Sequence, residues 1–233
     1  MGTGLRIDFT LYLRALPLLV RNPVVIAAPL LAGVIQVLLQ MLSGPLTDAV
    51  GGFGAGIFQF IGQIIFGFAF GVAIIFAEMA WRRGKASFDS AWEEARRKSA
   101  DLVFAAIGFL FIIFAAQYLG AVLGSIGSYI LGAAAVFFMI YTIPAAAIGG
   151  APGGMALSAS VRAVRANYLA AAVLAIVAIV VYYYVSFFAL ALLGPYLGLG
   201  FPIVQALFQA IAVSYLAFVF AKQYDEVAFT RRW

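Results

Sequence analysis

The sequence contains no cysteine and no histidine, and charged residues make up only 10% of its 233 residues. Without cysteine, no disulfide framework and no thiolate chemistry is available. Without histidine, the chain lacks the commonest metal ligand and the usual general base near neutral pH. We therefore expect no catalytic residues, no metal site and no cofactor, and an enzyme is the class of protein that the sequence favours least.

Charge is scarce because apolar residues dominate the chain, with 66% hydrophobic residues and a mean hydropathy of +1.10. A soluble domain carries about 25% charged residues. A water-soluble fold could not cover so much apolar surface with so few charges. The composition therefore predicts a single all-α membrane domain over 1–233, with no room for a separate soluble domain.

Six apolar stretches approach or reach the length that a membrane-spanning helix needs, which is about 20 residues. They are 23–42, 57–81, 101–120, 128–148, 168–193 and 201–221. The first is predicted to be a retained span and not a cleaved signal. Arginines are spread through the N-terminus, and no short apolar core with a small-residue cleavage site follows them.

All fourteen lysine and arginine residues fall on alternate connections between these stretches. The connections 43–56, 121–127 and 194–200 contain none. Cationic connections stay in the cytoplasm, so both termini are predicted to be cytoplasmic. We expect a multi-pass protein of the plasma membrane, the inner membrane of a prokaryote. The cations are Arg6, Arg14, Arg21, Arg82, Arg83, Lys85, Arg96, Arg97, Lys98, Arg162, Arg165, Lys222, Arg231 and Arg232.

The basic segment 87–99 predicts a short amphipathic helix lying in the membrane interface. Phe88 and Trp92 share its apolar face, and Ser87 is placed to cap its start. Two ion pairs are spaced i to i+4, namely Glu93 with Arg97 and Glu94 with Lys98.

The segment 156–168 repeats this pattern, and the N-terminus repeats it again. A shift of 69 residues superposes Phe88 on Leu157, Trp92 on Val161 and Arg96 on Arg165. The N-terminal copy, with Phe9, Leu13, Leu16 and Val20 on one face, needs a shift of 79. We expect a three-fold parallel repeat of interfacial helix plus hairpin, over 5–81, 85–148 and 156–221. The alternative is that basic amphipathic connections occur in any membrane protein built of hairpins.

Anionic lipid headgroups at the cytoplasmic face are the partners that the basic connections favour, and nucleic acid is not expected. Other membrane proteins are a further possible class of partner. Tryptophan prefers the membrane–water interface, and all three tryptophans, Trp233 included, fall on the basic side. The predicted interfacial lipid contacts are Trp81, Trp92, Arg96, Arg97, Arg162 and Arg165.

Three segments carry a family resemblance: GKASFDSAWEEARRK (84–98), ALSASVRAVRAN (156–167) and RNPVVIAAPLL (21–31). They resemble segments of six-span bacterial and archaeal membrane proteins, which are similar to the membrane domain fused to some glycerophosphoryl diester phosphodiesterases. The resemblance implies an embedded helical domain of poorly defined role, with any catalysis in the fused soluble barrel. This chain has no such barrel, so the resemblance argues against phosphodiesterase activity.

Seven glutamines fall in the predicted outer half of the membrane, and three pairs of them are spaced i to i+4, so that each pair lines one helix face. One interpretation is a polar, outward-facing cavity that binds or passes a small solute. The other is hydrogen bonding between helices, which contributes about 0.6–2 kcal/mol per contact. The seven are Gln36, Gln40, Gln59, Gln63, Gln117, Gln205 and Gln209.

Glu78 is the acidic residue that lies nearest the interior of a predicted span, and it is a candidate for proton or ion coupling. Arg82 follows at i+4, so an interfacial ion pair is the alternative. Gly67 and Gly71 form a G-x-x-x-G pair, which predicts close helix packing. Asp101 is placed to cap the third span.

The sequence favours a non-catalytic membrane protein, namely a scaffold, accessory or helper component that interacts with lipids or other membrane proteins. The alternative is a transporter or channel for small solutes or lipid-like molecules, using the glutamine-lined cavity. The sequence shows no titratable midplane pair, broken helix or inverted repeat of the kind typical of secondary transporters.

Overall fold

The computed structural model describes residues 8–50 and 52–229, and within these ranges the chain is helical without a single strand. A short helix followed by two long ones occurs three times in succession. The elements are α1 (Thr10–Arg21), η1 (Pro23–Ile26), α2 (Ala27–Val50), α3 (Gly52–Arg83), α4 (Phe88–Arg97), α5 (Ser99–Ala121), α6 (Ser125–Met139), α7 (Thr142–Ala147), α8 (Met155–Ala166), α9 (Tyr168–Leu197), η2 (Gly198–Gly200) and α10 (Phe201–Phe229).

Six helical segments are long and apolar enough to cross a membrane, and each overlaps one predicted stretch. The prediction of an all-α, six-span, membrane-embedded protein is therefore confirmed. The segments are Pro23–Ser43, Gly56–Arg83, Ser99–Ala121, Ser125–Ala147, Tyr168–Val185 and Phe201–Ala228.

The cation-free connections are shorter than the sequence predicted. The expected loop over 43–56 is wrong, because α2 continues to Val50 and α3 begins at Gly52. Three residues, 122–124, join α5 to α6, and Gly124 there has a φ of 91°, which favours glycine. Continuing a helix satisfies its backbone groups internally, whereas an open loop near the membrane leaves them exposed.

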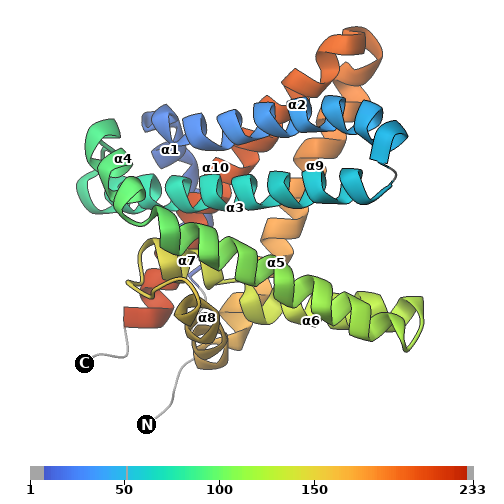
Figure 1. Ribbon diagram of the computed structural model, residues 1–233. Helices are drawn as coiled ribbons and strands as arrows, with labels where there is room; N and C mark the ends of the chain where they lie inside the picture. The colour runs from blue at the N-terminus through green and yellow to red at the C-terminus, as the bar shows by residue number, and fades with distance from the viewer. Residues whose placement is uncertain (1–7, 51, 230–233) are drawn as a thin grey trace.

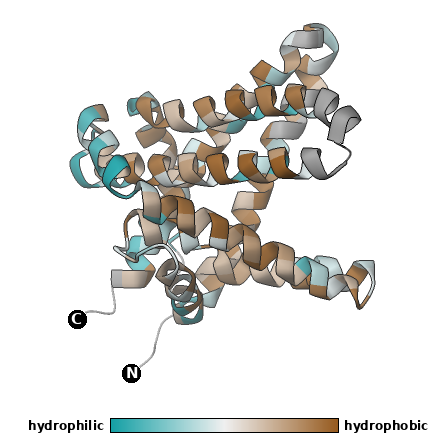
Figure 2. Cartoon of the chain, in the orientation of Figure 1, coloured by the Kyte–Doolittle hydropathy of each residue, from teal (hydrophilic) through white to brown (hydrophobic). Residues whose placement is uncertain are grey.

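The long helices form three hairpins, α2 with α3, α5 with α6, and α9 with α10. Figure 1 shows these hairpins meeting at one end and diverging toward the other. We call the shared end the basic end, because it holds α1, α4, α8 and the last turns of α3, α7 and α10. Figure 2 shows hydrophilic residues gathered there, while the hairpins are mainly hydrophobic along their lengths.

The second helix of each hairpin forms the core, and the first lies outside it. Within one 18-residue apolar window of each span, the buried share is 50% in Gly56–Arg83 and 56% in both Ser125–Ala147 and Phe201–Ala228. It is only 22%, 17% and 17% in the three first helices. The longest buried run, 140–147, covers the end of the second hairpin, and the next longest, 71–77 in α3, lies in the half of that helix nearer the basic end.

Glycines allow α3 to approach α5 closely, as the G-x-x-x-G pair predicted. A Cβ atom on Gly67 would lie 2.9 Å from the Cβ of Ala106. On Gly71 it would lie 2.6 Å from a methyl carbon of Leu102. Small residues at such crossings let two helix backbones pack in a membrane, where lipid competes equally for apolar surface.

The fourth span is broken, although the sequence predicted a continuous helix over 128–148 and no broken helix in the chain. α6 ends at Met139 and α7 begins at Thr142. Ser160 of α8 stabilises the break, because its hydroxyl accepts from the Tyr141 amide at 3.0 Å and donates to the Phe138 carbonyl at 2.8 Å. Pro144 lacks an amide donor and so favours interruption of this helix.

The three short helices end at Asn22, Lys98 and Asn167, which are 76 and 69 residues apart (22 to 98 and 98 to 167). The second spacing equals the predicted shift, and the first is three residues less than the predicted 79. A slip of about one turn leaves an apolar face nearly superposed, so the sequence pattern could not separate these registers.

At these spacings the buried positions of the short helices also align. Ala15, Ala91 and Ser160 are each at most 1% exposed, and Leu19, Ala95 and Val164 occupy the next aligned position with at most 7% exposed. Each short helix thus docks through the same side onto the core.

Asn22 and Asn167 share a second property, because each follows a short helix and precedes a span. The Asn22 side chain donates to Gly84 and accepts from Ala86, at 3.4 and 2.8 Å, while the Asn167 carbonyl accepts from Ala170 at 3.1 Å. Both asparagines therefore fix the bend between interfacial helix and span.

Candidate functional site

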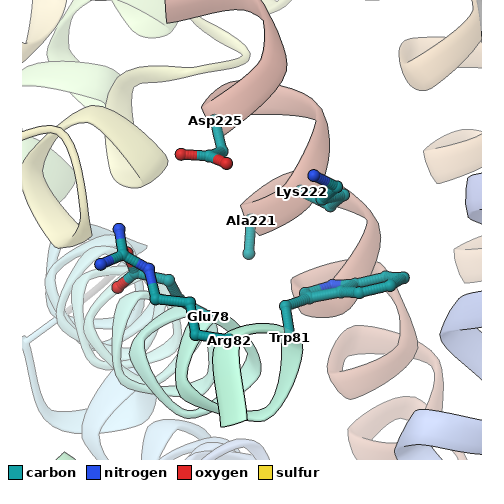
Figure 3. Close-up of a pocket in the computed structure, with 6 residues that line it drawn as sticks. All are labelled: Glu78, Trp81, Arg82, Ala221, Lys222 and Asp225. Atoms are coloured by element: carbon teal, nitrogen blue, oxygen red, sulfur yellow. The ribbon is translucent and has the colours of Figure 1, made fainter. Parts of the chain in front are cut away.

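A cavity of about 100 Å³ opens at the basic end between the last turns of α3 and α10 (Figure 3). The lining residues of α3 are spaced i, i+3 and i+4, and those of α10 are spaced i, i+1 and i+4. Each set therefore lies on one face of its helix. The lining residues are Glu78, Trp81 and Arg82 from α3, and Ala221, Lys222 and Asp225 from α10.

Glu78 forms the predicted ion pair with Arg82, at 2.6 Å between Oε1 and Nη2. The Glu78 side chain is 23% exposed and that of Arg82 is 68% exposed. The arginine therefore reaches from solvent to neutralise a largely covered carboxylate, as a pair on one helix face can. The alternative role of Glu78 in proton or ion coupling stays a prediction.

Trp81 joins the two helices that form the cavity. Its indole Nε1 donates to the Phe218 carbonyl of α10 at 2.9 Å, and its ring meets the Phe218 ring edge-on at 6.5 Å. Because its only hydrogen-bond donor is satisfied within the protein, Trp81 offers the cavity an apolar wall. Its predicted contact with lipid remains a prediction.

The two charged residues from α10 differ in their pairing. Lys222 lies 3.4 Å from Glu226, and both side chains are more than a third exposed. The Asp225 side chain makes no hydrogen bond and no ion pair within 8–50 and 52–229. In Figure 3 its carboxylate lies across the cavity from the Glu78–Arg82 pair, and Lys222 lies on the side of Trp81. The cavity therefore presents one unpaired carboxylate.

The other predicted lipid contacts also lie at the basic end. Trp92 is 47% exposed and stacks on Phe88, with ring centroids 6.3 Å apart. Arg162 donates to Ser158 at 3.3 Å, while Arg96 and Arg165 are exposed. These positions suit headgroup contact, which itself stays a prediction. Trp233 lies outside the described residues.

Two details predicted for 87–99 are wrong. Ser87 precedes α4 but its side chain accepts no capping bond from the helix amides. Arg97 pairs with Glu94 instead of Glu93. The predicted pair of Glu94 with Lys98 is confirmed at 2.9 Å.

Lys98 anchors the start of α5 to the end of α7. Its Nζ donates to the Ala147 carbonyl at 2.8 Å and pairs with Glu94, and the Lys98 hydrogen bond lowers the pKa of the Glu94 carboxyl. Asp101 does not cap the third span as predicted. It instead accepts from the Gly153 amide of the loop before α8, at 3.0 Å. Lys98 thus joins the two ends of the second hairpin, and Asp101 ties this hairpin to the loop before α8.

The seven glutamines occupy varied surroundings. Gln36 donates to the Gly62 carbonyl at 3.2 Å, which joins α2 to α3, and Gln117 packs against Gly132. Gln40 and Gln59 are exposed. The remaining three, Gln63, Gln205 and Gln209, are half-buried. The Gln36 bond matches the helix-pairing interpretation, while a shared polar cavity stays a prediction.

Sequence reasoning missed a glutamine at the other end of the bundle. Gln223 is 4% exposed, donates to the Ala170 carbonyl at 2.6 Å and accepts from the Tyr12 hydroxyl at 3.3 Å. It joins α1, α9 and α10. Burial raises the pKa of Tyr12 to about 12, so this phenol stays protonated as a donor. Gln223 lies two residues beyond the predicted span 201–221 and directly after Lys222, and nothing in this segment indicated that its side chain would be buried.

Tyr141 lies at the break in the fourth span and is fully buried. Its ring meets that of Tyr224 at 5.8 Å, but its hydroxyl has no hydrogen-bond partner among the residues that the structure describes. A buried hydroxyl without a partner is destabilising, so this side chain is a weak point of an otherwise packed core.

The acidic residues of the described segments do not gather into a group of three that could hold a metal ion. Comparisons of the chain with protein-family models, curated proteins and solved structures gave no match. The resemblance to membrane domains of glycerophosphoryl diester phosphodiesterases therefore stays a prediction, and the case for function rests on the geometry.

Proposed function

We propose that the protein is a non-catalytic component of the plasma membrane that binds lipids and other membrane proteins through the sides of its three hairpins. The observation that carries this proposal is the divergence of the hairpins from one packed end. Within the 18-residue apolar windows of their outer helices only 17–22% of the residues are buried, so large apolar faces are left for other molecules to cover.

The exposed faces belong to all three hairpins. Leu31, Phe111 and Ile176 lie on α2, α5 and α9 and are 62%, 68% and 61% exposed. In a bilayer, lipid chains or the helices of a partner can cover such residues equally well. A scaffold needs this kind of surface, whereas an enzyme needs converging polar groups.

The short helices support a second contact, with the membrane surface. In α1 the residues Phe9, Leu13, Leu16 and Val20 are 51–80% exposed, while Leu11, Ala15 and Leu19 pack inward. An exposed apolar stripe beside Arg14 and Arg21 suits a helix lying in the headgroup region. With the positive-inside rule, this end and both termini lie in the cytoplasm.

The aligned ends and buried positions of α1, α4 and α8 support a three-fold parallel repeat. Each unit then presents one interfacial helix and one hairpin in the same orientation. Three units that present these elements in the same orientation suit multivalent binding along the membrane plane.

Photo-crosslinking tests the proposal directly. A photoreactive residue at Ile176 should give one discrete protein adduct in native membranes, and that partner should co-purify stoichiometrically. The matched control is Met155, which is also 61% exposed but lies outside the spans and should give none. Adducts with lipid alone at Ile176, together with a solute flux in vesicles, would contradict the scaffold.

One observation favours the transporter alternative, namely the broken fourth span, since broken helices often mark transport sites. The double variant Gln59→Leu with Gln63→Leu separates the two functions. Under our proposal it remains folded and changes no flux. Loss of a measured flux with unchanged thermal stability would replace the scaffold with a transporter.

A further inference from the structure

The cavity between α3 and α10 lies where lipid headgroups meet the protein. Its lining residues occupy the last turns of Gly56–Arg83 and Phe201–Ala228, two of the six spans. A span end faces the headgroup layer, and tryptophan is typical of that depth. A lipid can therefore enter this site from the membrane without leaving the bilayer.

The charges of the cavity point to a zwitterionic ligand. Two acids, Glu78 and Asp225, and two bases, Arg82 and Lys222, give the lining a formal charge of zero. Glu78 is already paired with Arg82 at 2.6 Å. The Asp225 carboxylate has no partner in the described part of the chain, so a cation with N–H donors would form a charge-assisted hydrogen bond with it.

Lys222 can bind the anionic group of the same ligand. Its pair with Glu226 is long, at 3.4 Å, and both side chains are more than a third exposed. Exposed pairs of this kind contribute about 0–1 kcal/mol, so a phosphate can displace Glu226 readily. A ligand that carries an ammonium and a phosphate then has an acceptor in Asp225 and a cation in Lys222.

The cavity has room for a small cationic headgroup, because about 100 Å³ of it is open to the centres of water-sized groups and about 10–15 Å³ is enough for one water molecule. Hydrogen bonding, and not size, therefore selects the cation. A trimethylammonium group has no N–H to donate to Asp225.

We propose that this cavity binds the headgroup of an ethanolamine phospholipid, with its ammonium on Asp225 and its phosphate beside Lys222. The inference deepens the lipid-binding part of the proposed function and rests on it. It is independent of any protein partner that crosslinks at Ile176, because Ile176 of α9 does not line this cavity.

The test measures thermal stabilisation of the purified protein in detergent by added lipids. Phosphatidylethanolamine should raise Tm saturably, because a ligand that binds only the folded state stabilises it. Phosphatidylcholine and phosphatidylglycerol should give smaller shifts at equal concentration. Soluble phosphoethanolamine should bind much more weakly, since it lacks the acyl chains that hold a lipid at the span end.

Asp225→Asn should weaken the apparent affinity for phosphatidylethanolamine about tenfold, because a charge-assisted hydrogen bond is replaced by a neutral one. Lys222→Gln should also weaken it. The control Asp89→Asn changes an exposed acid of α4 and should leave the affinity unchanged. Should Asp225→Asn unfold, the Lys222→Gln variant and the lipid series on the unaltered protein still decide the matter.

Equal stabilisation by all three lipids would overturn the inference, as would an unchanged affinity in Asp225→Asn. Equally tight binding of soluble phosphoethanolamine would overturn the assignment to a lipid. Failure here is distinguishable from failure of the proposed function, because protein crosslinking at Ile176 does not depend on Asp225.

Discussion

At the basic end, side-chain hydrogen bonds join helices that are far apart in sequence, whereas the hairpins diverge toward the opposite end, where a ring contact between Phe60 and Phe114 connects two of them. Trp81 bonds α3 to α10, Gln223 bonds α1 and α9 to α10, and Ser214 of α10 bonds the Val25 carbonyl. Away from the basic end the hairpins are mainly hydrophobic (Figure 2).

This contrast shows what holds a membrane protein together. Lipid chains are as apolar as leucine, so hydrophobic residues do not by themselves draw helices together. Close packing of small residues and buried hydrogen bonds decide where helices meet, and both are concentrated at the basic end. The same helix can therefore be tightly packed at one end and lipid-facing at the other.

Leucine truncation along α9 should give the largest difference between the ends. Leu174 is fully buried near the basic end, and Leu192 is 61% exposed toward the other. Leu174→Ala should lower the free energy of unfolding by about 2–5 kcal/mol, because it opens a cavity. Leu192→Ala should change it little. Reversible unfolding in mixed micelles measures both, and similar losses would refute the contrast.

Glutamine replacement should give the next largest difference. Gln223→Leu leaves the Ala170 carbonyl and the Tyr12 hydroxyl without their partner, so we expect a loss of about 1–3 kcal/mol. Gln40→Leu alters an exposed glutamine of α2 and should be nearly neutral. If Gln40→Leu proved the more destabilising in the same assay, polar contacts near the opposite end would matter more than we infer.

Tyr141→Phe is the one substitution at the basic end that should not destabilise the protein. It removes a buried hydroxyl without a partner and keeps the ring contact with Tyr224, so stability should be unchanged or rise by about 1 kcal/mol. Thermal unfolding checks this. A clear loss would reveal a hydrogen bond to the hydroxyl in the membrane-bound protein.

Glu94→Gln should have the smallest effect, and that effect should depend on pH. Bonding to Lys98 lowers the pKa of Glu94 below its usual 4.5 in the folded state. The stabilisation is therefore complete above pH 4.5 and is lost as pH falls through the folded-state pKa. We expect the variant to lose less than about 1 kcal/mol at pH 7. The difference in Tm between the variant and the unaltered protein should disappear in acid. A larger difference in acid would contradict the lowered pKa of Glu94.

Features that depend on one segment were predictable from the sequence. The six spans follow from apolar length, the Glu78–Arg82 pair from i, i+4 spacing, and the approach of α3 to another helix from Gly67 and Gly71. Each relies on local geometry that a helix imposes on its own residues.

Features that depend on two distant segments were not predictable. The break at 140–141 is stabilised by Ser160, and nothing in either segment identifies the other. Likewise Asp101 accepts from Gly153 instead of capping its own helix. Asp225 and Glu78 line one cavity because α3 packs on α10, through contacts that include the Trp81 hydrogen bond to Phe218. The candidate site therefore required the packed arrangement of helices.

Single-cysteine labelling tests the central claim most directly, because the chain has no cysteine of its own. Ser90 of α4 and Ser125 at the start of α6 are both exposed, at the basic and opposite ends respectively. In intact cells, a membrane-impermeant maleimide should label Ser125→Cys and should reach Ser90→Cys only after the membrane is opened. Labelling of both variants from the same side would contradict the six-span arrangement and the assignment of the basic end to the cytoplasm.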